Sequence, residues 1–295
     1  MIHSQVKSIN RSAVSRHIDR QKSPNRPSPL KRPRAKTPTR PPRGHGIVLI
    51  DIGNTHTHIG FSRESRILQT TDLHTEDWAN ERNITRTRDW IGRTFKPDGA
   101  CLCSVVPSAT PAVQQALQEL FGFKALQLTP DTLHGIGIDY PNPTTIGQDR
   151  LANAAAAKHH FGCPSVVVDF GTAVTFDVIN SQGNYVGGVI APGLAAMTDY
   201  LHEKTALLPR ITIREPRRVI GKNTEEAMLV GAVHGYRGLV RELIRQLHQE
   251  LDINAMPVIA TGGYARLMAR RIPEITAVRP TLTLEGLRLT WMAHH

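Results

Sequence analysis

Two short turns carry the residue types that suit phosphate chemistry. Each follows an apolar strand and reads Asp, any residue, Gly and then a polar residue: I-V-L-I-D-I-G-N-T at 47–55 and S-V-V-V-D-F-G-T at 165–172. The N–H groups of such a turn can face anionic oxygens, and its aspartate can hold a bridging cation. Ordinary hairpin turns also favour Asp and Gly, so one copy would indicate little. Two copies predict two similar halves with a nucleotide between them.

A carboxylate and a guanidinium at the start of a helix form a second candidate. Asp149 and Arg150 follow Gly147 and Gln148 and open an alanine-rich helix at 151–161. Aspartate is common at a helix start, whereas the helix dipole disfavours arginine there unless it has another task. The pair therefore suits a site that binds an anion and moves a proton.

Alternating strands and helices must position these residues, which predicts an α/β fold. The patterns predict strands at 100–106, 125–128 and 257–260, and helices at 76–95, 111–121, 151–161, 225–250 and from 281 onward. Trp90 and Phe95 are expected to be partly buried in the first helix. Ser108 or Thr110 is expected to cap the second helix, and Thr224 the long one.

Small residues leave two questions open. Gly187 and Gly188 could approach an anion or simply allow tight packing, and Pro192-Gly193 leads into a further helix. The small residues on one face of the 225–250 helix allow close approach of another helix, either within the chain or in a dimer.

The composition indicates a globular protein of a reducing compartment, and we expect it in the cytoplasm. The chain has 295 residues, of which 40% are hydrophobic. No apolar run reaches the ~20 residues of a membrane span. Three cysteines are too few for a disulfide framework, and Cys101 and Cys103 alternate along an apolar strand as buried thiols would.

The formal charge of +11 is confined to an N-terminal arm. Residues 1–45 hold 12 Lys and Arg against one acid, Asp19, whereas 46–295 hold 24 of each sign. The arm is rich in Ser and Pro and too poor in apolar residues to order itself. A solvated tail is the simplest interpretation, with weak, salt-sensitive attraction to nucleic acid as the alternative. It also faintly resembles a transit peptide, although its prolines oppose the amphipathic helix.

Eight stretches of the chain resemble the type III pantothenate kinases, the group that includes the Bvg accessory factor homologues. They are D-I-G-N-T (51–55), S-V-V-P (104–107), the Tyr140 loop with G-Q-D-R (147–150), D-F-G-T-A (169–173), G-G-V-I-A-P-G (187–193), G-K-N-T (221–224), T-G-G (261–263) and L-T-L-E-G-L (282–287). They follow the family's order, and only the arm at 1–45 has no counterpart.

The resemblance implies the acetate and sugar kinase/Hsp70/actin fold. Two RNase-H-like halves, 46–160 and 161–295, would hold ATP in the cleft between them. The implied reaction is transfer of a phosphoryl group from ATP to pantothenate, which gives 4'-phosphopantothenate in the first step of coenzyme A synthesis. ATP would arrive with Mg²⁺, and a monovalent cation, K⁺ or NH₄⁺, would bind as well.

The resemblance also assigns residues to roles. Asp149 matches the proton acceptor, and Asp169 matches the aspartate that holds the monovalent cation. Pantothenate contacts fall on Tyr140, Gly147, Gln148, Asp149, Arg150 and Thr224, with Thr224 reaching in from the second subunit of a homodimer. ATP contacts fall on Asp51, Ile52, Gly53, Asn54, Thr55, His56, Thr57, His58 and Thr172. Many members carry Lys or Arg where His56 and His58 stand here, which leaves nucleotide affinity open.

Two other functions compete with this one. A kinase of the same fold could act on a sugar or carboxylate, although Tyr140 and G-Q-D-R oppose it. A nucleotide-binding regulator without turnover is the second, and the basic arm favours it. A regulator has no need of a base at Asp149, however, which favours the enzyme.

Overall fold

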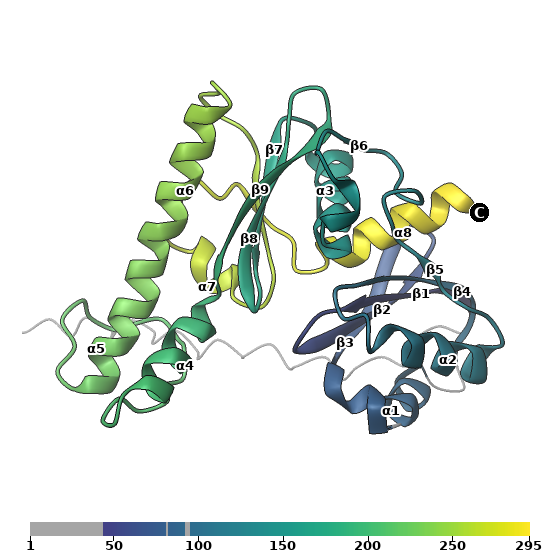
Figure 1. Cartoon of the computed structure of the whole chain (residues 1–295), viewed down its shortest axis with the longest axis horizontal. Coiled ribbons are helices and arrows are strands. Elements are labelled where there is room, and N and C mark those ends of the chain that lie inside the picture. Colours follow the sequence, from purple (N-terminus) through teal and green to yellow (C-terminus); the bar gives the residue numbers. More distant parts are fainter. Residues whose placement is uncertain (1–43, 81, 92–94) are drawn as a thin grey trace, which may run out of the picture. The chain divides into compact units, whose positions relative to one another are not determined.

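The computed structural model describes residues 44–80, 82–91 and 95–295, all in one unit, Pro41–His295. The predicted arm therefore lies outside the described residues, apart from its last two positions. Eleven strands of the described part form two sheets, and Figure 1 shows them with their helices. Apolar, β-branched runs such as those before Asp51 and Asp169 supply the central strands.

The first sheet has the strand order β3-β2-β1-β4-β5. Strands β1 to β3 are antiparallel neighbours, and β4 and β5 run parallel to β1. The strands are β1 (Gly44–Ile52), β2 (His56–Arg63), β3 (Arg66–His74), β4 (Phe95–Ser104) and β5 (Leu126–Gln127).

The second sheet repeats this arrangement. Its order is β11-β10-β7-β8-β9-β6, in which β7 to β9 are antiparallel and β10 and β11 run parallel to β7. Apart from the added β6, each β1 to β5 position has a counterpart, so the predicted duplication is confirmed. Its strands are β6 (Gly137–Ile138), β7 (Ser165–Phe170), β8 (Ala173–Ile179), β9 (Asn184–Pro192), β10 (Val258–Thr261) and β11 (Ala277–Val278). Two such sheets are the RNase-H-like halves of the acetate and sugar kinase/Hsp70/actin fold.

Helices cover both faces of each sheet. A buried cluster joins α3 (Gln148–Phe161) and α8 (Leu282–His294) to residues of both sheets, including Leu49, Cys101 and Val167. On the other face of the first sheet lie α1 (Arg82–Ile91) and α2 (Thr110–Phe121), packed around Val48 and Ile50. Cys101 and Cys103 are buried free thiols, as predicted.

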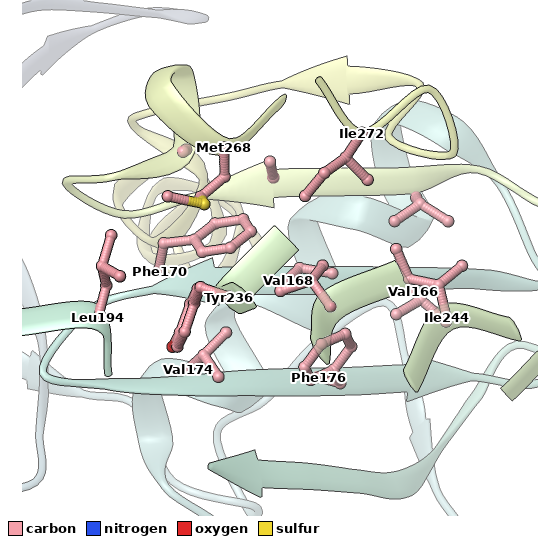
Figure 2. Close-up of a cluster of buried hydrophobic side chains, with 14 of the residues drawn as sticks. Val166, Val168, Phe170, Val174, Phe176, Leu194, Tyr236, Ile244, Met268 and Ile272 are labelled. Atoms are coloured by element: carbon pink, nitrogen blue, oxygen red, sulfur yellow. The ribbon is translucent and has the colours of Figure 1, made fainter. Parts of the chain in front are cut away.

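A third cluster fills the outer face of the second sheet. Val166, Val168 and Phe170 of β7 meet Tyr236 and Ile244 of α6 (Tyr236–Glu250), as Figure 2 shows. The remaining helices are α4 (Leu194–Lys204), α5 (Thr224–Val230) and α7 (Ala265–Ala269), with short helical turns at η1 (Thr75–Asn80), η2 (Pro143–Thr145) and η3 (Gly231–Gly235).

Some predicted elements need correction. The helix expected at 76–95 is a 3₁₀ turn, η1, followed by α1, and Phe95 already starts β4. Trp90 is partly buried as expected, whereas the Phe95 side chain lies outside the described residues. The helix expected at 225–250 is interrupted by the π-helical segment η3.

Both predicted helix caps are wrong. Asn223, and not Thr224, caps α5, because its side chain accepts a hydrogen bond from the N–H of Glu226 at 2.8 Å. Helix α2 has Ala109 at its cap position without a side-chain bond, and the Thr110 hydroxyl donates back to the Val106 carbonyl at 3.1 Å. A division of the halves at 160/161 stays a prediction, since α3 and α8 pack against both sheets. No helix of the described residues is long and apolar enough to cross a membrane.

Candidate active site

The two strand-end aspartates occupy equivalent positions in the two sheets. Asp51 is the second-last residue of the central strand β1, and Asp169 is the second-last residue of the central strand β7. Burial raises the pKa of Asp51 to about 7, and the negative charge of Asp149 adds to the rise. Burial likewise raises the pKa of Asp169 to about 6, against the hydrogen bond from Asn153. Electrostatics therefore link all three predicted aspartates in one group.

The two glycine turns meet through their hydroxyl residues. Thr55 Oγ1 and Thr172 Oγ1 lie 3.1 Å apart and share a hydrogen bond, although 117 positions separate them in the chain. The first turn is fixed from behind, because Thr75 Oγ1 donates to the Gly53 carbonyl at 2.6 Å. The Trp78 indole donates to Thr57 Oγ1 at 3.0 Å. The turns thus form one polar junction between the sheets, and a nucleotide between them stays a prediction.

Helix α3 presents Asp149 at its first turn. The Asp149 carboxylate accepts a hydrogen bond from the N–H of Arg150 at 2.8 Å. Burial raises the pKa of Asp149, whereas that N–H and the Arg150 charge lower it. Gln148 fixes the helix start to the first sheet, because its Oε1 accepts from the N–H of Ser104 at 2.9 Å. A partly buried carboxylate with a raised pKa is suited to accept a proton.

Arg150 is held by a partner that the sequence did not suggest. Its Nε donates to Asp177 Oδ1 at 2.6 Å, and Asp177 is fully buried on β8. Burial raises the pKa of Asp177 and the guanidinium opposes that rise, while Asp177 raises the pKa of Arg150 against burial. The Tyr185 hydroxyl also donates to Asp177, at 3.5 Å. The Tyr140 ring meets that of Tyr185 edge-on, with centroids 6.2 Å apart, so the Tyr140 loop joins this group.

Comparison with known proteins identifies the family to which the chain belongs. A family model described as type III pantothenate kinase matches residues 47–246. A type III pantothenate kinase of Akkermansia muciniphila is 47% identical over 249 residues, which are 82% of this chain and 96% of that protein. One of Methylacidiphilum infernorum is 42% identical over 244 residues, which are 82% and 87% of the two chains.

The chain belongs to the type III pantothenate kinase family. It is therefore an enzyme that uses ATP to phosphorylate pantothenate, the first step of coenzyme A synthesis, as the resemblance implied.

Solved structures agree on the fold. A putative Baf family transcriptional activator from Campylobacter jejuni aligns with a TM-score of 0.55 at 19% identity, covering 84% of this chain and 98% of that one. The ethanolamine utilization protein EutJ from Carboxydothermus hydrogenoformans gives 0.52 at 15% identity, with 86% and 92% covered. At these identities the likeness concerns the fold alone.

One further part of this kinase's site was missed by sequence reasoning. Asn153 donates to Asp169 Oδ2 at 3.0 Å, and Thr283 of α8 donates to Asn153 Oδ1 at 2.9 Å. Gly262, the first glycine of T-G-G, has a φ of +86°, and a Cβ there would lie 2.5 Å from Asp169 Oδ1. Gly262 of the T-G-G stretch thus lets the chain pack closely against the Asp169 carboxylate, and Thr283 of the L-T-L-E-G-L stretch positions Asn153, which donates to it.

Histidines line the first turn of this kinase. His58 Nδ1 lies 2.5 Å from Asp72 Oδ1, and the His56 ring packs 4.8 Å from that of His74. Burial lowers the pKa of His58, but Asp51 and Asp72 raise it further, so the net shift is upward. The pKa of His56 is lowered by burial and by His74. Of the two histidines, His58 is therefore the one whose positive charge is favoured.

Two predicted features are not assembled by this arrangement. Thr224 starts α5, and no hydrogen bond joins its side chain to another predicted site residue in the part of the chain that the structure describes. In the same part, no three His, Cys, Asp or Glu side chains are arranged to hold a metal ion by themselves. Packing explains Gly188, because a Cβ there would collide with the Phe176 carbonyl, whereas Gly187 has a φ of +121°, which favours glycine.

Proposed function

We propose that Asp149 is the general base of this pantothenate kinase and that ATP phosphates bind at the joined turns around Thr55 and Thr172. The observation that carries the proposal is geometric: a hydrogen bond of 3.1 Å joins the two turns, and the bond from the N–H of Ser104 to Gln148 fixes the start of α3, next to Asp149, at the end of β4 beside β1. Phosphoryl transfer needs positioned oxygens and charge neutralisation more than covalent chemistry from the protein. A base beside the phosphate turns supplies the first need, since it orients the attacking hydroxyl and takes its proton.

The other assigned residues bind the two substrates. Residues 51–58 and Thr172 contact ATP, and Tyr140, Gly147, Gln148 and Arg150 contact pantothenate. Arg150 Nε donates a hydrogen bond to Asp177 Oδ1 at 2.6 Å, and its Nη2 donates to the Phe176 carbonyl at 3.3 Å. Its Nη1 has no hydrogen-bond partner among the described residues, so it is available to the substrate carboxylate. Asp177 and Tyr185 position this guanidinium.

The carboxylates fit the cations that the family implies. Asp51 and Asp169 have raised pKa values because burial and neighbouring carboxylates are not balanced by positive charge. Asp51 would hold the divalent ion that comes with ATP, and Asp169 would hold a monovalent ion, K⁺ or NH₄⁺. Both ions would supply positive charge beside the phosphate turns. We place the enzyme in the cytoplasm on composition alone.

Asp149→Asn tests the assignment of the base. A positioned base is typically worth ~10²–10⁴-fold in rate, so turnover with pantothenate and ATP should fall by that factor while ATP binding stays intact. Asp252→Asn is the matched control, because Asp252 is exposed and its φ of +52° suits asparagine equally. Unchanged turnover in Asp149→Asn would remove Asp149 from this role. A wild type that binds ATP without turnover would instead favour the regulator.

A further inference from the structure

A second polar cavity lies at the other end of α3 from Asp149. It measures about 450 Å³ and is lined by the β2–β3 hairpin, by His160 near the end of α3 and by the start of α8. Because α3 has 14 residues and a helix rises about 1.5 Å per residue, roughly 20 Å separate its two ends. The cavity is thus distinct from the phosphate turns.

Its charges are strongly unbalanced. Arg66, Arg279 and Arg288 line it against a single acid, Glu285, which leaves an excess of two positive charges with His160 neutral. Glu285 is already engaged on both oxygens. Oε2 lies 2.7 Å from His160 Nε2, and Oε1 accepts from the Thr281 hydroxyl at 2.8 Å. The only carboxylate of the lining is therefore bonded to His160 and Thr281, and it forms no ion pair with an arginine of the cavity.

Arg288 is the residue that points to a ligand. Its side chain is 8% exposed, yet within the described residues it forms no hydrogen bond and no ion pair. None of its nitrogens is among the fully buried polar atoms that lack a partner in the described residues, so the guanidinium opens to the cavity while the rest of the residue is buried. The other two arginines differ: Arg66 is exposed, and Arg279 lies over the Phe161 ring at 5.5 Å. Arg288 thus faces the cavity with its hydrogen-bonding capacity unused.

We propose that this cavity binds a small molecule that carries a dianionic phosphate group, with Arg288 as its principal partner. The planar guanidinium donates two parallel hydrogen bonds to phosphate oxygens, and a dianion balances the two excess charges. The α8 N-terminus contributes a favourable dipole for an anion. The volume falls in the range of small-molecule sites and exceeds the needs of one phosphate, and Ile67 and Leu68 add apolar wall for the rest of the ligand.

The test is calorimetric titration of the full chain with glycerol 3-phosphate. Saturating pantothenate and a non-hydrolysable ATP analogue keep the probe out of the active site. Wild type should bind, and Arg288→Met should weaken binding by at least about tenfold, because a charge-assisted bidentate contact is lost. Turnover by Arg288→Met should equal that of wild type. Arg241→Met is the matched control and should bind the probe as wild type does, since Arg241 pairs with Glu274 away from the cavity.

Two results would overturn the proposal. One is a wild type that does not bind the probe, and the other is equal affinity in wild type and Arg288→Met. Folding is not expected to obscure the answer, since replacing an unpaired guanidinium by an apolar side chain is usually neutral or stabilising. Arg66→Ala, on the exposed hairpin, gives an independent reading and should also weaken binding.

Discussion

At the scale of single residues, the strand-end aspartates make stability depend on pH. The folded pKa values of Asp51 and Asp169, about 7 and about 6, lie above the ordinary 3.8. Between pH 4 and 7 the folded state therefore binds more protons than the unfolded state. The stability that these groups contribute is fully present below pH 4 and is lost as pH rises through 6 to 7.

This linkage predicts that the cation-free protein loses stability between pH 4 and 7. Each unit of pKa shift is worth about 1.4 kcal/mol, so Asp51 alone contributes a few kcal/mol. Urea denaturation at several pH values measures it, and Asp51→Asn isolates the share of this residue. The wild type should lose more free energy of unfolding with rising pH than the variant. Equal slopes in the two proteins would contradict the assigned pKa.

Residues that carry a local motif could be predicted from the sequence, and their supporting partners could not. Asp51 and Asp169 precede recognisable glycine turns, and Asp149 belongs to the G-Q-D-R motif. Asp177 meets Arg150 from 27 positions away, and Thr283 meets Asn153 from 130 positions away. Neither pair has a spacing that a local period would reveal. Only the fold, which brings β8 to the start of α3 and α8 alongside it, pairs them.

At the scale of elements, the close approach of α3 and α8 depends on one glycine. A Cβ on Gly286 would collide with the Ala152 carbonyl oxygen, whereas a Cβ on Gly238 of α6 would meet nothing within 4 Å. Gly286→Ala should therefore destabilise by about 1–3 kcal/mol, as overpacking does. Gly238→Ala should stabilise by about 0.5–1 kcal/mol, because alanine loses less backbone entropy. Chemical denaturation of the two variants provides the comparison, and a Gly286→Ala as stable as wild type would refute the close contact.

The type of an element could be predicted where apolar residues recur at a regular spacing. The predicted boundaries were wrong where that spacing gives no signal. The strands before Asp51 and Asp169 and helices α2 and α3 were found from their patterns. The helix expected at 225–250 has a continuous helical pattern, yet it contains the π-helical turn Gly231–Gly235, which no residue type announces. At the start of α5, Asn223 and Thr224 both suit a cap, and only backbone geometry selects Asn223.

At the scale of the whole molecule, a homodimer would complete the substrate site. Among the described residues, no hydrogen bond joins the Thr224 side chain to Tyr140 or Asp149. Exposed apolar residues stand near Thr224 in sequence: Val219 and Ile220 are each 71% exposed. We expect Thr224→Ala to raise KM for pantothenate by about 2–10-fold, the worth of one hydrogen bond, without changing KM for ATP. Light scattering should give the mass of two chains.

Mixed dimers can show whether Thr224 acts in the active site of its own chain or in that of the partner chain. If Thr224 acts across the interface, a dimer of one Asp149→Asn chain and one Thr224→Ala chain would have one intact site. That site would combine Asp149 of the second chain with Thr224 of the first. The mixture should then show turnover with the wild-type KM for pantothenate. If Thr224 acts within its own chain, no intact site can form and only the raised KM will be measured.

The positive charge of the arm predicts that any affinity for DNA can be separated from kinase turnover by truncation. All of the net charge of +11 resides in residues 1–45, and β1 starts at Gly44. Removing residues 1–43 should leave kinase turnover unchanged, because the family match begins at residue 47. Any affinity for DNA should be steeply salt-dependent in the full chain and absent from the truncated one. A loss of turnover on truncation would instead make the arm part of the enzyme.

Helix α8 has a consequence for the order in which the protein folds. It packs against β1, β2 and β4 of the first sheet, although it is synthesised roughly 230 residues after β1 ends. On the ribosome, the inner face of the first sheet therefore lacks the cover of α8 until that helix has been synthesised, with α3 as its partial cover before then. Contacts so distant in sequence slow folding and prolong the exposure of apolar surface. The first half to be translated should be the last to become stable, and its nascent chain is the part of this kinase that most needs a chaperone.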